Sequence, residues 1–371
     1  MSDSTSLQRS PLHEAHLALG ARMVPFAGWE MPVQYTGIME EHKAVRGQVG
    51  VFDISHMGQF LFEGPGAEAF LNRAFTNNVS SLEPGQGQYS LMLNKQGGVI
   101  DDLIVYRLSE REYFVVVNAS MIDEDEAHLR SLNWGEDVEF ANISAVTGGV
   151  AVQGPKSREV FAKVFGPEAH FPERNTIALS VTEEGILYLC GTGYTGEDGF
   201  EFFAPAVTFR GWFEDLVKAS REVGGMPCGL GARDSLRLEM GYPLNGNDLA
   251  PDKTPLEAGL GFFVDLTKED FTGQDVLLEQ KAQGLRTKLT GFRMTSTGPP
   301  PRPHYPVWHE GSQVGEVCSG GLGPSLGQGI GMAYLPASLS KPGNAIEIEI
   351  RGKRYPAETV KKPFYRPEKQ S

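Results

Sequence analysis

The stretch GGVIDDLIVYRLSEREYFVVVNAS, residues 97–120, contains two apolar runs on either side of the polar segment SERE. β-branched and aromatic residues dominate both runs, so the stretch predicts two antiparallel strands joined by a turn. The spacing of GAEAFLNRAF before it and of MIDEDEAHLRSLN after it is helical. Residues 56–144 are therefore expected to form one compact α+β lobe.

Two aspartates stand side by side in the first run of this hairpin. Side chains alternate along a strand, so Asp101 and Asp102 point to opposite faces and cannot share one task. Asp is uncommon in strands, and burying a bare carboxylate is costly. Two interpretations stay open at this point: a solvent-exposed pair just after the Gly97-Gly98 turn, or one carboxylate that meets donors from a ligand.

The rest of the chain also has the pattern of an α+β protein. The whole sequence contains 45 glycines and 24 prolines, which predict many short elements separated by turns. Strands such as GILYLCGTG and GFEFFAP alternate with the helical pattern FRGWFEDLVKASREVG, and five prolines in residues 299–306 predict a stiff connection. The alternation in AIEIEI then predicts a small all-β part. We expect three domains: a discontinuous α+β lobe of residues 1–55 and 145–285, the α+β lobe of residues 56–144, and a C-terminal β-barrel-like domain of residues 286–371.

The bulk properties indicate an acidic protein large enough to enclose a site. Its 371 residues carry a net charge of −14, which argues against a general binder of nucleic acid or of anionic membranes. The three cysteines form no CxxC pair, there is no HExxH pattern, and no apolar run has the length of a membrane span. We therefore expect a cytoplasmic protein without a metal, and a histidine such as His56 is expected to be packed rather than catalytic.

A second candidate stretch is GTGYTGEDGFEFF, residues 191–203. Glycines at 193, 196 and 199 predict a tight loop, after which Phe200 and Phe202 share one strand face and Glu201 points to the other. A carboxylate held on a strand accepts two parallel N–H bonds from a flat heterocycle, such as a pterin edge. The alternative is an ordinary hairpin with solvated acids.

A third candidate stretch is GARDSLRLEMG, which predicts a helix that opens near Gly231 and ends at Gly241. Arg233 in its first turn opposes the helix dipole, whereas Asp234 follows it. Such an arginine suits a ligand carboxylate, and pairing with an acid of the protein explains it equally well.

Together with LGARMVPFAGWEMPVQY, AVRGQVGVFDISHMG, QGPKSREV, NGNDLAPDKTPLEAGLGFFV and KKPFYR, these stretches resemble the glycine cleavage T-protein family over nearly the whole chain. The resemblance implies a three-domain ring around a central folate pocket. It also implies an aminomethyltransferase that takes the aminomethyl group from the lipoyl arm of the H-protein, releases ammonia and forms 5,10-methylenetetrahydrofolate.

The resemblance also implies roles for individual residues. Asp102 would be the catalytic residue at the ring nitrogens of tetrahydrofolate, Glu201 would bind the pterin, and Arg233 would lie near the anionic tail. The remaining expected pocket residues are Tyr194, Asn118, Tyr89 and Met57.

Two other functions are compatible with folate binding. A folate-dependent demethylase would use a small sulfur or nitrogen methyl donor in place of a lipoylated protein. A folate-binding accessory factor of the iron–sulfur maintenance type would carry a KGCYxGQE stretch, which this sequence lacks.

Overall fold

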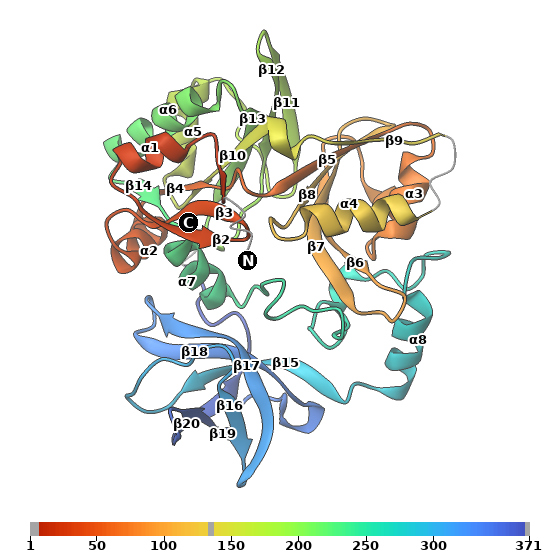
Figure 1. The fold of residues 1–371 in the computed structure, drawn as a ribbon, viewed down its shortest axis with the longest axis vertical. Helices are drawn as coiled ribbons and strands as arrows, with labels where there is room; N and C mark the ends of the chain where they lie inside the picture. Colours follow the sequence, from red (N-terminus) through yellow and green to blue (C-terminus); the bar gives the residue numbers. More distant parts are fainter. Residues whose placement is uncertain (1–6, 133–136, 368–371) are drawn as a thin grey trace, which may run out of the picture. The chain divides into compact units, whose positions relative to one another are not determined.

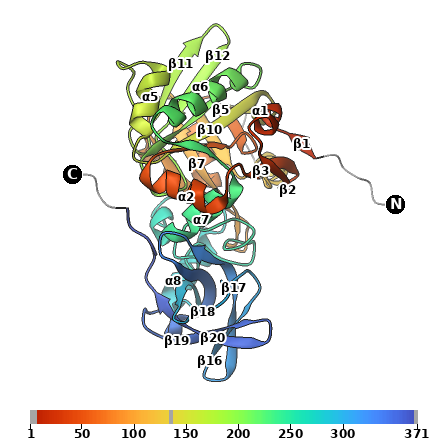
Figure 2. The ribbon, with the colours of Figure 1, turned by 90° about the vertical axis from the view of Figure 1, so that its left-hand side faces the viewer.

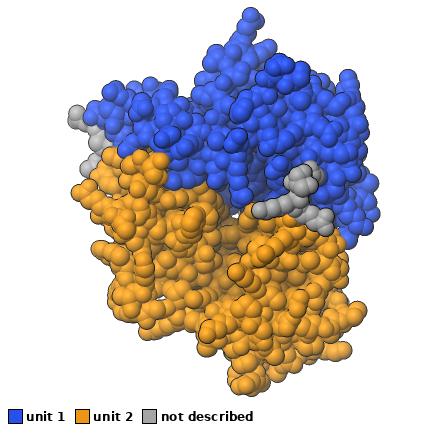
Figure 3. Space-filling view, turned by 180° about the vertical axis from the view of Figure 1, so that it is seen from behind, with its two compact units in different colours: residues 1–68, 82–88, 104–234 blue, residues 69–81, 89–103, 235–371 orange. Residues whose placement is uncertain are grey.

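The structure is a computed structural model that describes residues 7–132 and 137–367 (Figure 1). Helices and antiparallel sheets are mixed along most of the chain, and a closed all-β barrel follows, so the predicted α+β class with a small all-β C-terminal part is confirmed. The described residues group into two compact units, one within 1–68, 82–88 and 104–234, the other within 69–81, 89–103 and 235–371 (Figure 3).

The first unit is built on a six-stranded sheet with the order β11-β12-β13-β10-β4-β14. Most neighbouring strands are antiparallel, and only β14 runs parallel to β4. A small sheet with the order β1-β3-β2 belongs to the same unit. The bounds of these strands are β1 Gln8–Arg9, β2 Arg22–Phe26, β3 Trp29–Gln34, β4 Gly50–Asp53, β10 Thr147–Gln153, β11 Ile177–Thr182, β12 Gly185–Cys190, β13 Gly199–Pro205 and β14 Met226–Cys228.

Helices cover the apolar face of the six-stranded sheet. Phe200 and Phe202 of β13 are fully buried in one core cluster with Phe161, Phe209 and Phe213, which come from the helices above them. The helices α5 and α6 lie side by side over the strands (Figure 2). The predicted side-chain alternation of β13 is thereby confirmed. The helices are α1 His13–Ala18, α2 Ile38–Gly47, α5 Ser157–Phe165 and α6 Phe209–Glu222.

The predicted hairpin is present as β7 Val99–Arg107 and β8 Glu112–Val117, which pair antiparallel. It forms the middle of a five-stranded sheet with the order β6-β7-β8-β5-β9. Residues 89–103 of β6 and β7 belong to the second unit, and the rest of the hairpin belongs to the first. The other elements here are β5 Gly58–Glu63, β6 Gly87–Leu93, β9 Glu139–Asn142, α3 Ala67–Ala74 and α4 Ile122–Ser131.

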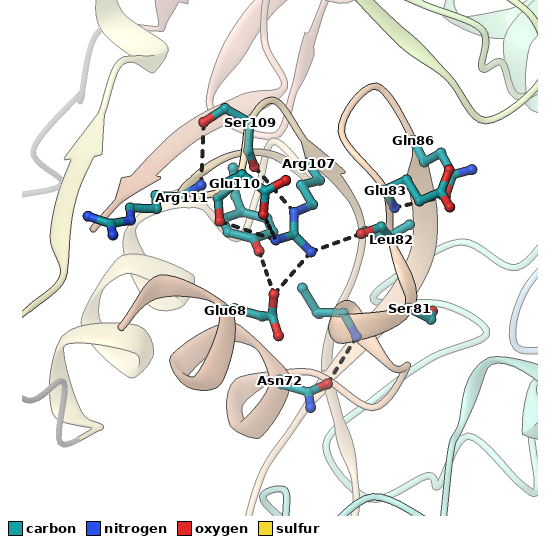
Figure 4. Close-up of polar contacts among 12 residues, drawn as sticks. Glu68, Asn72, Ser81, Leu82, Glu83, Gln86, Arg107, Ser109, Glu110 and Arg111 are labelled. Carbon is teal, nitrogen blue, oxygen red and sulfur yellow. Dashed lines mark hydrogen bonds and ion pairs between the residues drawn. The ribbon is translucent and has the colours of Figure 1, made fainter. Parts of the chain in front are cut away.

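Arg107 closes the turn of this hairpin (Figure 4). Its guanidinium donates to the main-chain carbonyls of Leu82 at 2.9 Å and Ser109 at 3.2 Å, and it forms an ion pair of 3.0 Å with Glu68. A buried arginine whose donors are met in this way fixes the turn geometry. The turn lies where the SERE segment predicted it.

The second unit contains a closed barrel with the order β15-β18-β17-β16-β19-β20, lined by a cluster of buried side chains that includes Phe292, Val307 and Ile348. The segment AIEIEI is strand β19, as its alternation predicted. The bounds are α7 Leu230–Met240, whose first residues belong to the first unit, α8 Gln274–Gln283, β15 Thr287–Met294, β16 Pro306–His309, β17 Ser312–Gly323, β18 Gln328–Pro336, β19 Ala345–Ile350 and β20 Lys353–Val360.

A smaller core in the second unit packs under the start of β7. Leu91, Leu93 and Val99 contact Leu249 and Leu277 there, and all five side chains are fully buried. The compact units do not test the predicted division into three domains, or their arrangement as a ring, and both stay predictions.

We predict that Gly98 tolerates no side chain. A Cβ at this position would lie 1.8 Å from the main-chain oxygen of Pro251, so Gly98→Ala has to displace backbone. We expect a loss of about 2 kcal/mol in the free energy of unfolding, measured by chemical denaturation.

The matched control is Gly211→Ala in helix α6, where a Cβ meets nothing within 4 Å. Alanine there should stabilise the protein by about 0.5 kcal/mol, because glycine is a poor helix residue. Equal effects of the two substitutions would contradict the packing argument.

Candidate active site

Asp101 is a buried structural acid. Its exposed fraction is 0%, and it accepts a hydrogen bond from the side-chain amide of Asn245. The same amide donates to the main-chain oxygen of Ile100 at 2.9 Å. One side chain therefore holds both the backbone and the first aspartate at the start of β7, and the interpretation of a solvent-exposed pair is wrong for Asp101.

The segment that carries Asn245 is itself anchored in the second unit. The Val99 N–H donates to the carbonyls of Ala250 at 3.2 Å and Lys253 at 2.9 Å. In the same segment as Asn245, Asp248 is fully buried and accepts hydrogen bonds from Arg237 at 3.0 Å and from the Ser319 hydroxyl at 2.6 Å. Burial raises the pKa of Asp248, and the charge of Arg237 opposes this rise. A buried pair of this kind fixes the segment in one position.

Asp102 is half-buried on the opposite side of β7, as the alternation predicted. The Tyr89 hydroxyl donates to its Oδ2 atom at 2.9 Å. The Tyr89 ring packs edge-on against Phe263 of the short helix Gly261–Phe263, with 4.6 Å between the ring centroids. Two of the predicted site residues, Asp102 and Tyr89, are therefore in direct contact.

The loop of residues 191–199 in the first unit requires its glycines. A Cβ on Gly193 or Gly199 would lie 1.9 Å or 2.4 Å from the side chain of Gln153. That side chain binds the start and the middle of the loop, since it donates to the Thr192 carbonyl at 3.1 Å and accepts from the Thr195 hydroxyl at 2.9 Å. The predicted tight loop is present, and its glycines leave room for the Gln153 side chain.

Glu201 extends from β13 toward this loop and is half-buried. The Thr192 hydroxyl donates to its Oε2 atom at 2.6 Å, and the Tyr106 hydroxyl lies 2.7 Å from the Thr192 oxygen. Burial raises the pKa of Glu201, while the Thr192 bond and the charge of Arg233 lower it. An oriented carboxylate with little water around it is suited to a ligand that presents N–H groups.

Arg233 and Tyr194 lie together in the first unit. The guanidinium carbon is 4.8 Å from the centroid of the Tyr194 ring, within cation–π distance. Burial lowers the pKa of Arg233, and the charges of Glu201 and Tyr194 oppose this. A half-buried guanidinium near a carboxylate and an aromatic face suits a flat polar ligand with an anionic group.

Asn118 and Met57 lie directly next to two paired strands, β8 and β5. Asn118 comes directly after β8, and its carbonyl accepts the Met121 N–H at 3.0 Å. Met57 directly precedes β5, and its carbonyl accepts from the Gln59 amide at 2.6 Å. Both side chains are half-buried, which is compatible with the predicted wall positions.

His56 is packed, as expected for a lone histidine beside a strand. Its exposed fraction is 2%, and the Phe26 ring lies edge-on to it at 5.7 Å. Burial lowers the pKa of His56 from 6.5 to about 4, the charge of Asp53 opposes this shift, and the charge of Arg233 adds to it. The imidazole is therefore neutral at pH 7.

The structure thus brings Glu201, Arg233 and Tyr194 together in one unit, and Asp102 and Tyr89 together in the other. Sequence reasoning missed Thr192 and Asn245. Thr192 lies in the glycine-rich stretch of residues 191–203, but nothing in that stretch predicts that its hydroxyl binds Glu201. Asn245 lies far along the chain from Asp101, and no pattern in the sequence connects them.

No group of three or more His, Cys, Asp or Glu side chains within residues 7–132 and 137–367 is arranged to hold a metal ion. In the same described part of the chain, every helix is too short or too polar to cross a membrane.

Two family models match the chain: the GCVT N-terminal domain over residues 12–268 and the glycine cleavage T-protein C-terminal barrel domain over residues 287–366. The chain is 44% identical to the aminomethyltransferase of Symbiobacterium thermophilum, with 97% of this chain and 98% of that protein covered. It is also 44% identical to the aminomethyltransferase of Halothermothrix orenii, with 96% and 100% covered. The crystal structure of the glycine cleavage system aminomethyltransferase T from Bartonella henselae has a TM-score of 0.91 to it at 35% identity, with 98% and 99% covered.

The depressed pKa of His56 predicts a pH-dependent stability. Between pH 6.5 and about 4 the unfolded chain binds a proton at this position and the folded chain does not. Stability is therefore full above pH 6.5 and falls as the pH drops toward 4, by about 3 kcal/mol for this group. The measurement is chemical denaturation at pH 7 and pH 4.5, with wild type compared to His56→Gln.

His56→Gln should show a shallower loss of stability between these two pH values. The exposed His170 provides the control, and His170→Gln should keep the slope of the wild type. A wild-type slope in His56→Gln would contradict the assignment of a neutral, buried imidazole.

Proposed function

The chain belongs to the glycine cleavage T-protein family, and on this premise we propose that it is an aminomethyltransferase of glycine catabolism that uses tetrahydrofolate. In this reaction the methylene carbon of a carrier-bound aminomethyl group passes to tetrahydrofolate, and ammonia is released. The relatives that share nearly the full length of the chain are named aminomethyltransferases. The demethylase and the accessory factor are therefore not favoured.

The observation that carries the catalytic assignment is the carboxylate of Asp102, half-buried on β7 and oriented by the Tyr89 hydroxyl. Positive charge develops on the one-carbon unit as ammonia leaves. A carboxylate about 4 Å from a full charge, at an effective dielectric constant near 20, interacts by about 4 kcal/mol. A fraction of this energy in the transition state, together with orientation of the folate amines, accelerates transfer without a nucleophile.

We assign folate binding to Glu201 and Arg233 of the first unit and to four wall residues, of which Tyr194 is one. Glu201 would accept N–H bonds from the pterin edge, because the Thr192 hydroxyl already fixes the carboxylate plane. Arg233 would bind an anionic group of the folate while its guanidinium rests on the Tyr194 ring. Asn118, Met57 and Tyr89 would complete the walls. The chemistry needs no metal.

We propose that the donor is the lipoylated H-protein of the glycine cleavage system. The carbon to be transferred is then bonded to both sulfur and nitrogen, which explains why ammonia is a product. We also propose a cytoplasmic location, because Cys190, Cys228 and Cys318 are free thiols, as in proteins of reducing compartments.

Asp102→Asn should cut turnover by 100-fold or more, by the usual size of a lost electrostatic stabiliser, and leave tetrahydrofolate binding nearly intact. Asp101→Asn should do far less, because an asparagine there still offers an oxygen to the Asn245 amide. The measurement is ammonia and methylenetetrahydrofolate formed from aminomethylated H-protein, with and without tetrahydrofolate.

Two outcomes of this assay would count against the proposal. Equal losses in both variants would remove the distinction between the aspartates. Wild-type protein that releases no folate-stimulated ammonia from aminomethylated H-protein would not be an aminomethyltransferase with this donor.

Glu201→Gln should weaken tetrahydrofolate binding by about 10-fold or more, because one of two acceptor oxygens becomes an NH₂ donor that faces a donor edge. Binding is measured by isothermal titration calorimetry. Glu184→Gln, at an exposed turn, is the control and should bind folate as the wild type does. Unchanged affinity in Glu201→Gln would place the pterin elsewhere.

A further inference from the structure

Lys268 has an unusual environment in the second unit. Its half-buried ammonium donates to three main-chain carbonyls, those of Asn72 at 2.6 Å, Phe75 at 2.5 Å and Asn77 at 3.0 Å. The Nζ atom also lies 4.7 Å from the centroid of the Phe271 ring. Burial lowers the pKa of Lys268 to about 8, and the charges of Asp265 and Asp270 oppose this shift.

The three carbonyls belong to the end of helix α3 and to the turn that follows it. The last carbonyls of a helix have no partners within the helix, and a cation there also interacts favourably with the helix dipole. Lys268 thus caps α3 from 196 residues away in the sequence. The turn is tied further by the Asn72 side chain, which accepts the Val79 N–H at 2.9 Å (Figure 4).

The turn held by Lys268 is hydrogen-bonded to Tyr89 and to the two residues that follow it. The Asn77 side-chain amide donates to the Tyr89 carbonyl at 2.9 Å, and the Asn77 N–H donates to the Ser90 hydroxyl at 2.9 Å. Thr76 accepts the Leu91 N–H at 3.2 Å and donates to the carbonyl of Phe263 at 2.9 Å, the residue whose ring packs on Tyr89.

We propose that Tyr89 and Lys268 are positioning residues for the Asp102 carboxylate: the Tyr89 hydroxyl orients it, and Lys268 sets the place of Tyr89 through the 72–77 turn. The proposal rests on the proposed function, since it presupposes that Asp102 is the catalytic carboxylate. Tyr89 then orients Asp102 in addition to lining the pocket, and the Lys268 cap of α3 affects catalysis through Tyr89.

A hydroxyl donor stabilises the ionised form of a carboxylate and fixes the direction of the carboxylate. If the Tyr89 hydroxyl uses its hydrogen on Asp102, the hydroxyl contributes only weakly to folate affinity. Loss of the donor should therefore reduce kcat more than it changes KM for tetrahydrofolate. It should also move the acid limb of the kcat/KM profile to higher pH, because the carboxylate then ionises less easily. A purely structural role would leave that limb in place.

The experiment compares Tyr89→Phe, Lys268→Met and the double variant in the full-length protein, with Asp102→Asn alongside. We expect Tyr89→Phe to lower kcat about 10-fold and to shift the acid limb upward, with KM for tetrahydrofolate within about 3-fold of wild type. Lys268→Met should shift the limb in the same direction by a smaller amount. The double variant should lose little more than Tyr89→Phe alone, because Lys268 acts through the hydroxyl that is already missing.

Two controls match the substitutions. Tyr113→Phe removes a tyrosine hydroxyl from another carboxylate, that of Glu68 at 3.4 Å, and Lys163→Met removes an exposed lysine that pairs with Glu222. Both should keep the wild-type pH profile.

An unshifted acid limb in Tyr89→Phe would overturn the orienting role of the hydroxyl. Additive losses in the double variant would overturn the link from Lys268 to Tyr89. If Lys268→Met does not fold, Asn77→Ala tests the same link, since it removes the bond to the Tyr89 carbonyl. Full activity in Asp102→Asn would instead reject the proposed function itself, so the two failures are distinguishable.

Discussion

The hydrogen bonds from the Asn245 amide to Asp101 and to the Ile100 carbonyl are the constraint on which the candidate site depends. They pair an irregular segment with the start of a strand, and they satisfy a carboxylate that would be costly to bury alone. Because side chains alternate along the strand, fixing Asp101 inward also fixes the opposite direction for Asp102. Asp101 therefore has a structural role, and its fixed position gives Asp102 a defined direction.

The two carboxylates assigned to the site are oriented in the same way. A neutral hydroxyl donates to each: Tyr89 to Asp102, and Thr192 to Glu201. A hydroxyl fixes the carboxylate plane without cancelling its charge, unlike the arginine that meets the buried Asp248. The contrast distinguishes Asp248, whose charge is paired within the fold, from the two carboxylates that we propose for the site.

Much of the fold followed from local patterns. The hairpin at residues 97–120, the aromatic face of GFEFFAP and the strand AIEIEI are present where the alternation and turn residues predicted them. The glycine-rich loop before Glu201 also formed as predicted, because its glycines leave room for one neighbouring side chain, Gln153. The family resemblance supplied the choice of Asp102, which periodicity alone left open.

The sequence by itself determined that the two aspartates point apart, because strand geometry is a local property with a period of two. Only the tertiary structure decided which of them is buried, because their partners, Asn245 and Tyr89, come from segments before and after the strand. Lys268, which caps α3 from far along the chain, is likewise brought to its partners only by the tertiary fold. Long-range hydrogen bonds of single side chains leave no periodic signal, and so the fold has to bring the partners together before their roles are visible.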